Sequence, residues 1–196
     1  MRNWEALYKK IGPLRYQSST SDCVPTTLIN GLTVLLERQI EPRLLQLIWA
    51  LSLDREKVGT GWVCCDVLSN LLSKWFDRAH EDGYEKAALP FTSKIIEGNS
   101  VHLRKGNPIL RCLNSDGVAC LSTAEHYYLI LGVENDKFLL FDCWWDKSNT
   151  PKRLQELGAY KGLVNTTWSR EDLENILTDF KWVHLLSKKG SVDAIP

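Results

Sequence analysis

Along the first third of the chain, apolar residues recur every three or four positions, the spacing of helices that bury one face. This pattern predicts helices from Cys23 to about Leu36, from Pro42 to about Leu53 and from about Val63 to Arg78. Asp22 suits the N-cap of the first helix. Pro25 is tolerated there because it lies in the first turn. The N-terminal part of the chain is therefore predicted to be helical.

After Pro90 the apolar residues form short runs, which are typical of strands. The segment 93–96 is compatible with either a strand or a short helix. The turn signal Gly106-Asn107-Pro108 precedes ILRCL, which we interpret as a strand. A polar loop is expected from Asn114 to Ala124.

The runs HYYLILGV and KFLLFDCW flank Glu134-Asn135-Asp136 and predict a hairpin. Both runs are apolar on both faces, so this hairpin should lie centrally in a sheet. Ser169 is expected to cap a late helix, SREDLENILTDF, with Asp172 completing a capping box. KWVHLLS is the last predicted strand. Helices followed by antiparallel strands indicate an α+β architecture.

The composition is that of one ordinary globular domain spanning residues 1–196, with 44% hydrophobic and 24% charged residues. The 24 basic and 24 acidic residues cancel, and no long run of one sign suggests a nucleic-acid partner or a membrane-surface patch. The longest apolar stretch, Leu44 to Leu53, is too short to span a bilayer. The N-terminus lacks an apolar signal region. We therefore expect a cytoplasmic protein with reduced thiols and no membrane partner.

The six cysteines include no Cys-x-x-Cys pair, so neither a metal site nor a cofactor is predicted. Five of them are interpreted as buried structural residues: Cys64, Cys65, Cys112, Cys120 and Cys143. Three histidines are likewise given structural roles: His80, His102 and His184. The glycosylation-like triplet Asn165-Thr166-Thr167 is interpreted as chance.

Four residues together suggest nucleophilic catalysis. Cys23 opens a predicted helix, Gln17 lies six residues upstream, His126 opens a strand and Asp142 ends the next strand. A thiolate can attack, an imidazole can activate it, a carboxylate can orient the imidazole, and an amide can stabilise an oxyanion. The positive end of a helix favours a thiolate at Cys23, whereas the neighbouring Asp22 opposes it.

Strand register tests whether His126 and Asp142 can meet. A three-residue hairpin loop places Asp142 opposite Tyr128, whose side chain shares a face with His126. A two-residue loop places His126 and Asp142 on opposite faces unless a bulge intervenes. The hypothesis therefore requires either an odd loop or a bulge.

The Q-x-x-x-x-D-C motif that ends at Cys23 resembles that of the bacterial bacteriocin-processing, double-glycine leader peptidases and their soluble relatives. These belong to the papain-like cysteine peptidase superfamily. GNPILRCL resembles the strand before the catalytic histidine, and HYYLILGVENDKFLLFDCW resembles the histidine hairpin that ends in aspartate. TGWVCCDVLSNLLSKWF resembles the intervening helix and WSREDLENIL the late helix. The resemblance covers roughly Arg15 to Ser187.

The resemblance implies a papain-like fold in which helices pack on an antiparallel sheet. It implies that Cys23 is the nucleophile, His126 the general base, Asp142 the orienting residue and Gln17 the oxyanion donor. Asp142-Cys143-Trp144 also resembles the papain pattern Asn-Ser-Trp, in which the tryptophan shields the orienting bond from water.

The chain departs from the family pattern at two positions near the nucleophile and the histidine. Val24 and Glu125 stand where the family commonly has glycine. Their side chains are expected to narrow or charge the approach of an extended peptide.

The expected function is a thiol hydrolase that cleaves a peptide or isopeptide amide in a peptide or protein substrate. An acyltransferase or a protein deamidase would use the same triad. A non-catalytic binding module that keeps the fold is the third possibility.

Overall fold

The computed structural model describes residues 2–52, 90–104, 106–123, 126–147, 152, 163–178 and 182–189. The predicted helix from Val63 to Arg78 lies outside these residues. The helices within them are α1 (Trp4–Ile11), α2 (Cys23–Leu36), α3 (Pro42–Ser52), η1 (Gly98–Ser100), α5 (Pro108–Asn114) and α7 (Arg170–Thr178). The strands are β1 (Phe91–Glu97), β2 (Val118–Ser122), β3 (Tyr127–Glu134), β4 (Lys137–Asp142), β5 (Thr166–Ser169) and β6 (Trp182–Lys188).

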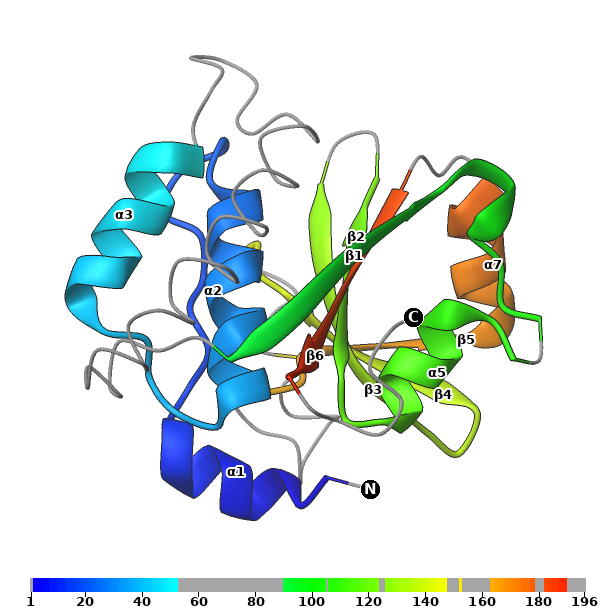
Figure 1. Cartoon of the computed structure of the whole chain (residues 1–196), viewed down its shortest axis with the longest axis horizontal. Helices are drawn as coiled ribbons and strands as arrows, with labels where there is room; N and C mark the ends of the chain where they lie inside the picture. The colour runs from blue at the N-terminus through cyan, green and yellow to red at the C-terminus, as the bar shows by residue number, and fades with distance from the viewer. Residues whose placement is uncertain are drawn as a thin grey trace.

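The strands form one antiparallel six-stranded sheet in the order β1-β6-β2-β3-β4-β5. Figure 1 shows α1, α2 and α3 on one side of this sheet, with α5 and α7 on the other. Each face has its own buried apolar cluster, because neighbouring residues of a strand point to opposite faces. Leu129, for example, belongs to one cluster and Ile130 to the other. The α+β class and the packing of the N-terminal helices on the sheet are confirmed.

Helix α2 is the central helix of its layer. Residues 24–35 are all buried, so this helix is enclosed rather than amphipathic. It packs against β2, β3 and β6 in the middle of the sheet. Its bounds match the prediction from the apolar pattern, and α3 ends at Ser52, one residue before the predicted end.

Two sequence-based predictions between the helical half and the hairpin are wrong. The ILRCL segment lies in helix α5, because Asn107 Oδ1 accepts the Leu110 N–H at 2.9 Å and Pro108 occupies the first turn. The expected loop 114–124 contains strand β2 instead, and this strand precedes His126. The undecided segment 93–96 lies in strand β1. An apolar run this short does not separate helix from strand, whereas a cap does.

The late elements agree with the prediction. Asp172 Oδ2 accepts the Ser169 N–H at 2.8 Å, and Ser169 Oγ accepts the Asp172 N–H at 3.0 Å, which is a capping box. Helix α7 follows, and β6 is the last strand. No helix among the described residues is both long and apolar enough to cross a bilayer.

Candidate active site

Cys23 is the first residue of helix α2, and its side chain is half-buried. Asp22 occupies the N-cap position, as predicted, but its carboxylate makes no capping bond to the helix. It turns back to accept from Ser18 N–H and Ser18 Oγ, both at 2.8 Å, and from Ser19 N–H at 2.9 Å. These three donors satisfy the carboxylate in the loop before the helix. As a result, the Asp22 side chain leaves the N-terminal N–H groups of α2 unoccupied.

The hairpin between β3 and β4 has a two-residue turn. Glu134 pairs with Lys137, and both turn residues have positive φ, 50° at Asn135 and 59° at Asp136. These angles are those of a type I′ turn, whose twist matches that of the flanking strands. A two-residue turn alone would put His126 and Asp142 on opposite faces of the hairpin.

A β-bulge between Ile130 and Gly132 corrects the register. Past the bulge, Tyr128 lies directly opposite Asp142. His126 is two residues before Tyr128, so its side chain shares a face with Tyr128 and with Asp142. The structure therefore realises the two-residue loop with an intervening bulge.

His126 and Asp142 are in direct contact. The ring Nε2 and Asp142 Oδ1 are 2.9 Å apart, and the two side chains are 15% and 12% exposed. Asp142 Oδ1 also accepts the Trp144 N–H at 2.8 Å. Burial alone lowers the pKa of His126, but the hydrogen bond to Asp142 and the thiols of Cys143 and Cys23 raise it well above its usual value. The imidazolium form is therefore favoured here.

Thr123 holds the backbone of His126, and Tyr128 packs against its ring. Thr123 accepts the His126 N–H with its hydroxyl oxygen at 3.0 Å and donates its own N–H to the His126 carbonyl at 2.8 Å. Tyr128 packs against the ring in a T-shaped contact at 4.6 Å and itself packs against Trp168. Trp144, which the papain resemblance suggested as a shield, is 45% exposed. Tyr128 packs on the His126 ring, and the shielding role of Trp144 stays a prediction.

Asn165 holds the backbone of Asp142 on both sides. Its Oδ1 accepts the Asp142 N–H, and its Nδ2 donates to the Asp142 carbonyl, both at 2.7 Å. Asn165 is buried, and its Nδ2 also lies 3.4 Å from the Tyr16 hydroxyl. Its role was missed because the triplet it begins was interpreted as chance glycosylation.

Gln17 lies beside Cys143. The Gln17 N–H donates to the Cys143 carbonyl at 2.9 Å, and the Cys143 Sγ lies 3.2 Å from Gln17 Oε1. The Gln17 Nε2 donates to the Ser19 carbonyl at 2.7 Å. Cys143 Sγ is also 3.6 Å from Thr27 Oγ1 and 3.7 Å from the Cys23 carbonyl. The contacts of Cys143 thus connect the Gln17 loop to the start of α2.

The structure places all four predicted residues, Gln17, Cys23, His126 and Asp142, around the junction of α2 with the end of the β3–β4 hairpin. It adds Cys143 and Asn165. Neither carries a motif of its own in the sequence, and Cys143 was grouped with the buried structural cysteines. No group of three or more potential ligands among the described residues is arranged to hold a metal ion.

Comparison with solved structures reveals a similar architecture. The peptidase domain of Streptococcus ComA, a bi-functional ABC transporter involved in a quorum sensing pathway, matches with a TM-score of 0.51 and 13% identity, covering 90% of this chain and 98% of that one. This chain has the papain-like fold of that domain. The peptidase domain of Streptococcus mutans ComA matches at 14% identity, alone (TM-score 0.40) and with a small-molecule inhibitor (0.37), each over 89% of this chain and 98% of that one. No family model and no curated protein sequence matches the chain.

Val24 and Glu125, which stand where the family commonly has glycine, were expected to narrow or charge the approach of a peptide. Val24 is buried in the apolar cluster of the α2 layer, so its side chain does not narrow the approach to Cys23. The expectation that it would is wrong, because the Val24 side chain faces the core. Glu125 lies outside the described residues.

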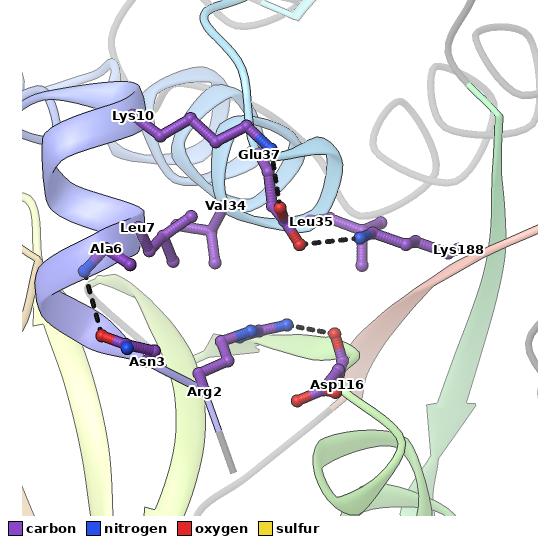
Figure 2. Close-up of a pocket in the computed structure, with 10 residues that line it drawn as sticks. All are labelled: Arg2, Asn3, Ala6, Leu7, Lys10, Val34, Leu35, Glu37, Asp116 and Lys188. Carbon is purple, nitrogen blue, oxygen red and sulfur yellow. Dashed lines mark hydrogen bonds and ion pairs between the residues drawn. The ribbon is translucent and has the colours of Figure 1, made fainter.

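A separate pocket lies at the other end of α2 (Figure 2). Glu37 lines this pocket and directly follows the last residue of α2. Because α2 has 14 residues and begins at Cys23, roughly 21 Å of helix separates the pocket from Cys23. Glu37 already accepts from Lys10 at 2.9 Å and Lys188 at 3.0 Å, and Arg2 donates to backbone carbonyls. Lys10, Glu37 and Lys188 are thus paired with one another, and this pocket is not part of the candidate active site.

Proposed function

We propose that the chain is a thiol hydrolase that cleaves a peptide or isopeptide amide in a peptide or protein substrate. The main supporting observation is the 2.9 Å contact between His126 and Asp142, next to a half-buried Cys23 at the start of a helix. The thiol of Cys23 contributes to the raised pKa of His126, which links the two side chains electrostatically. A thiol, an imidazole and a carboxylate in this order form the usual arrangement of an activated nucleophile.

The proposed reaction proceeds through an acyl-enzyme. The Cys23 thiolate attacks the amide carbon, and the resulting oxyanion is stabilised by Gln17 and by the first N–H groups of α2. The carbon–nitrogen bond breaks as the His126 imidazolium gives its proton to the leaving amine. A water molecule then attacks the thioester while His126 accepts its proton, and the carbon–sulfur bond breaks to restore the thiolate.

The geometry assigns separate tasks to the two ring nitrogens of His126. Because Nε2 is occupied by Asp142, Nδ1 is the nitrogen left to exchange a proton with Cys23. Asp142 thereby fixes both the tautomer and the plane of the ring. No step of this reaction requires a metal ion or an organic cofactor.

Of the two thiols near His126, we assign the nucleophile to Cys23. Cys143 is completely buried, and burial raises the pKa of its thiol, so it stays protonated at neutral pH. Cys23 is half-buried and begins a helix, where partial positive charge favours the thiolate. A substrate carbonyl can therefore approach Cys23 but not Cys143.

The test is covalent labelling of the full chain. The wild type and Cys23→Ala are treated with peptide probes that carry an electrophile in place of the scissile amide, and the intact mass is measured. We expect one adduct on the wild type and none on Cys23→Ala. Cys120→Ala, which removes a fully buried thiol from β2, is the matched control and should label like the wild type.

The proposal is wrong if Cys23→Ala labels as fast as the wild type, or if the wild type reacts no faster than a free thiol peptide. A labelled wild type that transfers its acyl group only when an amine is added would identify an acyltransferase with the same triad. Release of ammonia from a glutamine side chain in a partner protein would identify a deamidase.

A further inference from the structure

We propose that Cys143 is a positioning residue that fixes the side-chain amide of Gln17 in the orientation needed to donate to an oxyanion. This inference rests on the proposed thiol chemistry at Cys23. It gives a task to a cysteine whose sequence context marks it only as buried.

The Cys143 thiol has a single proton to donate. Its sulfur lies 3.2 Å from Gln17 Oε1, 3.7 Å from the Cys23 carbonyl and 3.9 Å from the Tyr127 carbonyl. The Thr27 hydroxyl also lies near this sulfur but can donate to the Tyr127 carbonyl at 3.1 Å. The His126 ring also faces this thiol, but its imidazolium form has no acceptor nitrogen. Because Gln17 Oε1 is the nearest oxygen, the thiol proton is directed to it.

Both ends of the Gln17 amide have a defined partner. The thiol donor of Cys143 faces the amide oxygen, and the Ser19 carbonyl accepts one proton from Nε2 at 2.7 Å. Rotating the amide by half a turn would place NH₂ against the thiol donor and oxygen against a carbonyl. Both contacts would then be lost. The second N–H of Nε2 is left in one defined place, where it can serve as the oxyanion donor.

The backbone of Cys143 also holds Gln17. The Cys143 carbonyl accepts the Gln17 N–H at 2.9 Å, so the same residue fixes both the main chain and the side chain of Gln17. Cys143 directly follows Asp142, whose carboxylate contacts His126. A single dipeptide at the end of β4 thus orients the imidazole through one residue and the oxyanion donor through the next.

The experiment compares two reactions of Cys23 that differ in their need for an oxyanion donor. With p-nitrophenyl acetate, the Cys23 sulfur bonds to the acetyl carbon, an oxyanion forms, and the ester carbon–oxygen bond breaks to release p-nitrophenolate. With iodoacetamide, the sulfur displaces iodide from a saturated carbon and no oxyanion forms. The ratio of the two rates therefore reports the oxyanion donor separately from the availability of the thiolate.

For Cys143→Ala we expect at least a roughly 10-fold loss in acylation rate, with iodoacetamide alkylation within about 2-fold of the wild type. Gln17→Ala should lose roughly 100- to 1000-fold, the usual range for one oxyanion donor. The double variant should lose no more than Gln17→Ala alone, because Cys143 acts through Gln17. Cys143→Ser should retain most of the acylation rate, since a hydroxyl can donate to the same oxygen.

Cys112→Ala is the matched control, because it removes another buried thiol that lies near backbone carbonyls on the opposite face of the sheet. It should leave the ratio of the two rates unchanged. The inference is overturned if Cys143→Ala keeps the wild-type ratio. It is also overturned if the losses of Cys143→Ala and Gln17→Ala multiply in the double variant, or if Cys143→Ala lowers both reactions equally.

A second measurement keeps this inference separate from the proposed function. If the wild type is acylated no faster than Cys23→Ala, the proposed function fails. The positioning contact is then tested by the NMR signals of the Gln17 side-chain amide, assigned by their loss in Gln17→Ala. We expect them to shift toward those of a free amide in Cys143→Ala and to stay near their wild-type positions in Cys143→Ser. Identical signals in the wild type and Cys143→Ala would overturn the inference whatever the reactivity.

Discussion

Asp142 is the residue on which the geometry of the candidate site depends most. Its Oδ1 receives the His126 ring nitrogen and the Trp144 N–H, and Asn165 binds its backbone N–H and carbonyl. Hydrogen bonds thus fix both the carboxylate and the backbone of Asp142. An imidazole held by a fixed carboxylate loses less freedom when it transfers a proton, which is the purpose of an orienting group.

The charge of Asp142 controls the protonation of His126. Burial disfavours the imidazolium, so the raised pKa of His126 depends chiefly on its hydrogen bond to this carboxylate. In Asp142→Asn the negative charge is gone, and the pKa of His126 should fall by roughly 1 to 3 pH units. The measurement is an NMR titration of the ring protons in both proteins. If the His126 ring titrates at the same pH in both, the carboxylate does not hold its proton.

Asn165→Ala should destabilise the protein without removing any member of the triad. The variant leaves the buried N–H and carbonyl of Asp142 without their partner, and each unpaired group costs roughly 1 to 3 kcal/mol. Denaturant unfolding measures this loss. Thr167→Ala, on the neighbouring strand β5 and only partly buried, is the control and should change the unfolding free energy far less.

At the scale of elements, the β3–β4 hairpin decides whether His126 and Asp142 meet. The apolar runs predict both strands, and the turn residues predict the turn, because these signals are local. The choice between a three-residue loop and a bulge depends on pairing along the whole hairpin. A glycine inside a strand pattern often marks a bulge, and Gly132 stands where the register shifts. That signal was present in the sequence but was not used.

Helix α5 and strand β2 were predicted wrongly for different reasons. The α5 segment is short and apolar and satisfies helix and strand periodicity equally well, whereas the five residues of β2 lie within a segment interpreted as a polar loop. The deciding contact for α5 is local, since Asn107 caps it within one turn. The deciding contacts for β2 are with β3 and β6, which are distant in the sequence. Caps are therefore a better guide than apolar runs for elements of this length.

A substitution in the type I′ turn tests the β3–β4 hairpin alone. Asp136 has a φ of 59°, a conformation that costs a residue with a side chain more than it costs glycine. Asp136→Gly should therefore raise the unfolding free energy by roughly 0.5 to 1 kcal/mol and leave the reactivity of Cys23 unchanged. Thermal unfolding and iodoacetamide alkylation check the two parts. If Asp136→Gly is less stable than the wild type, the Asp136 carboxylate makes a contact that stabilises the protein by more than the positive φ costs.

At the scale of the whole molecule, the candidate site joins the two halves of the chain. Gln17 and Cys23 come from the helical half, and His126 and Asp142 come from the sheet half. Residue types, their order and the family resemblance led to the prediction of these four. Cys143 and Asn165 were not predicted because their tasks exist only as contacts between segments distant in the sequence. Such contacts join separate segments of the folded chain and cannot be inferred from any one of them.

The sheet also contains a buried histidine that should make the stability of the molecule depend on pH. His184 in β6 is completely buried, its Nδ1 has no hydrogen-bond partner in the part of the chain that the structure describes, and its Nε2 contacts Ser93 Oγ. Burial lowers the pKa of His184 to about 4, against 6.5 for an exposed histidine. The folded protein therefore keeps this ring neutral in conditions where the unfolded chain would bind a proton.

The sign of the effect follows from that difference. Above pH 6.5 the ring is neutral in both states, and His184 adds no pH dependence. As the pH falls from 6.5 to about 4, only the unfolded chain gains the proton, so the unfolding free energy drops by about 3 kcal/mol at pH 4 from this group. His184→Gln has no such group, and its unfolding free energy should fall less over the same interval. Denaturant unfolding of both proteins at several pH values measures the difference. If the unfolding free energies of the two proteins fall in parallel between pH 6.5 and 4, the buried ring takes up its proton in the folded state as readily as in the unfolded chain.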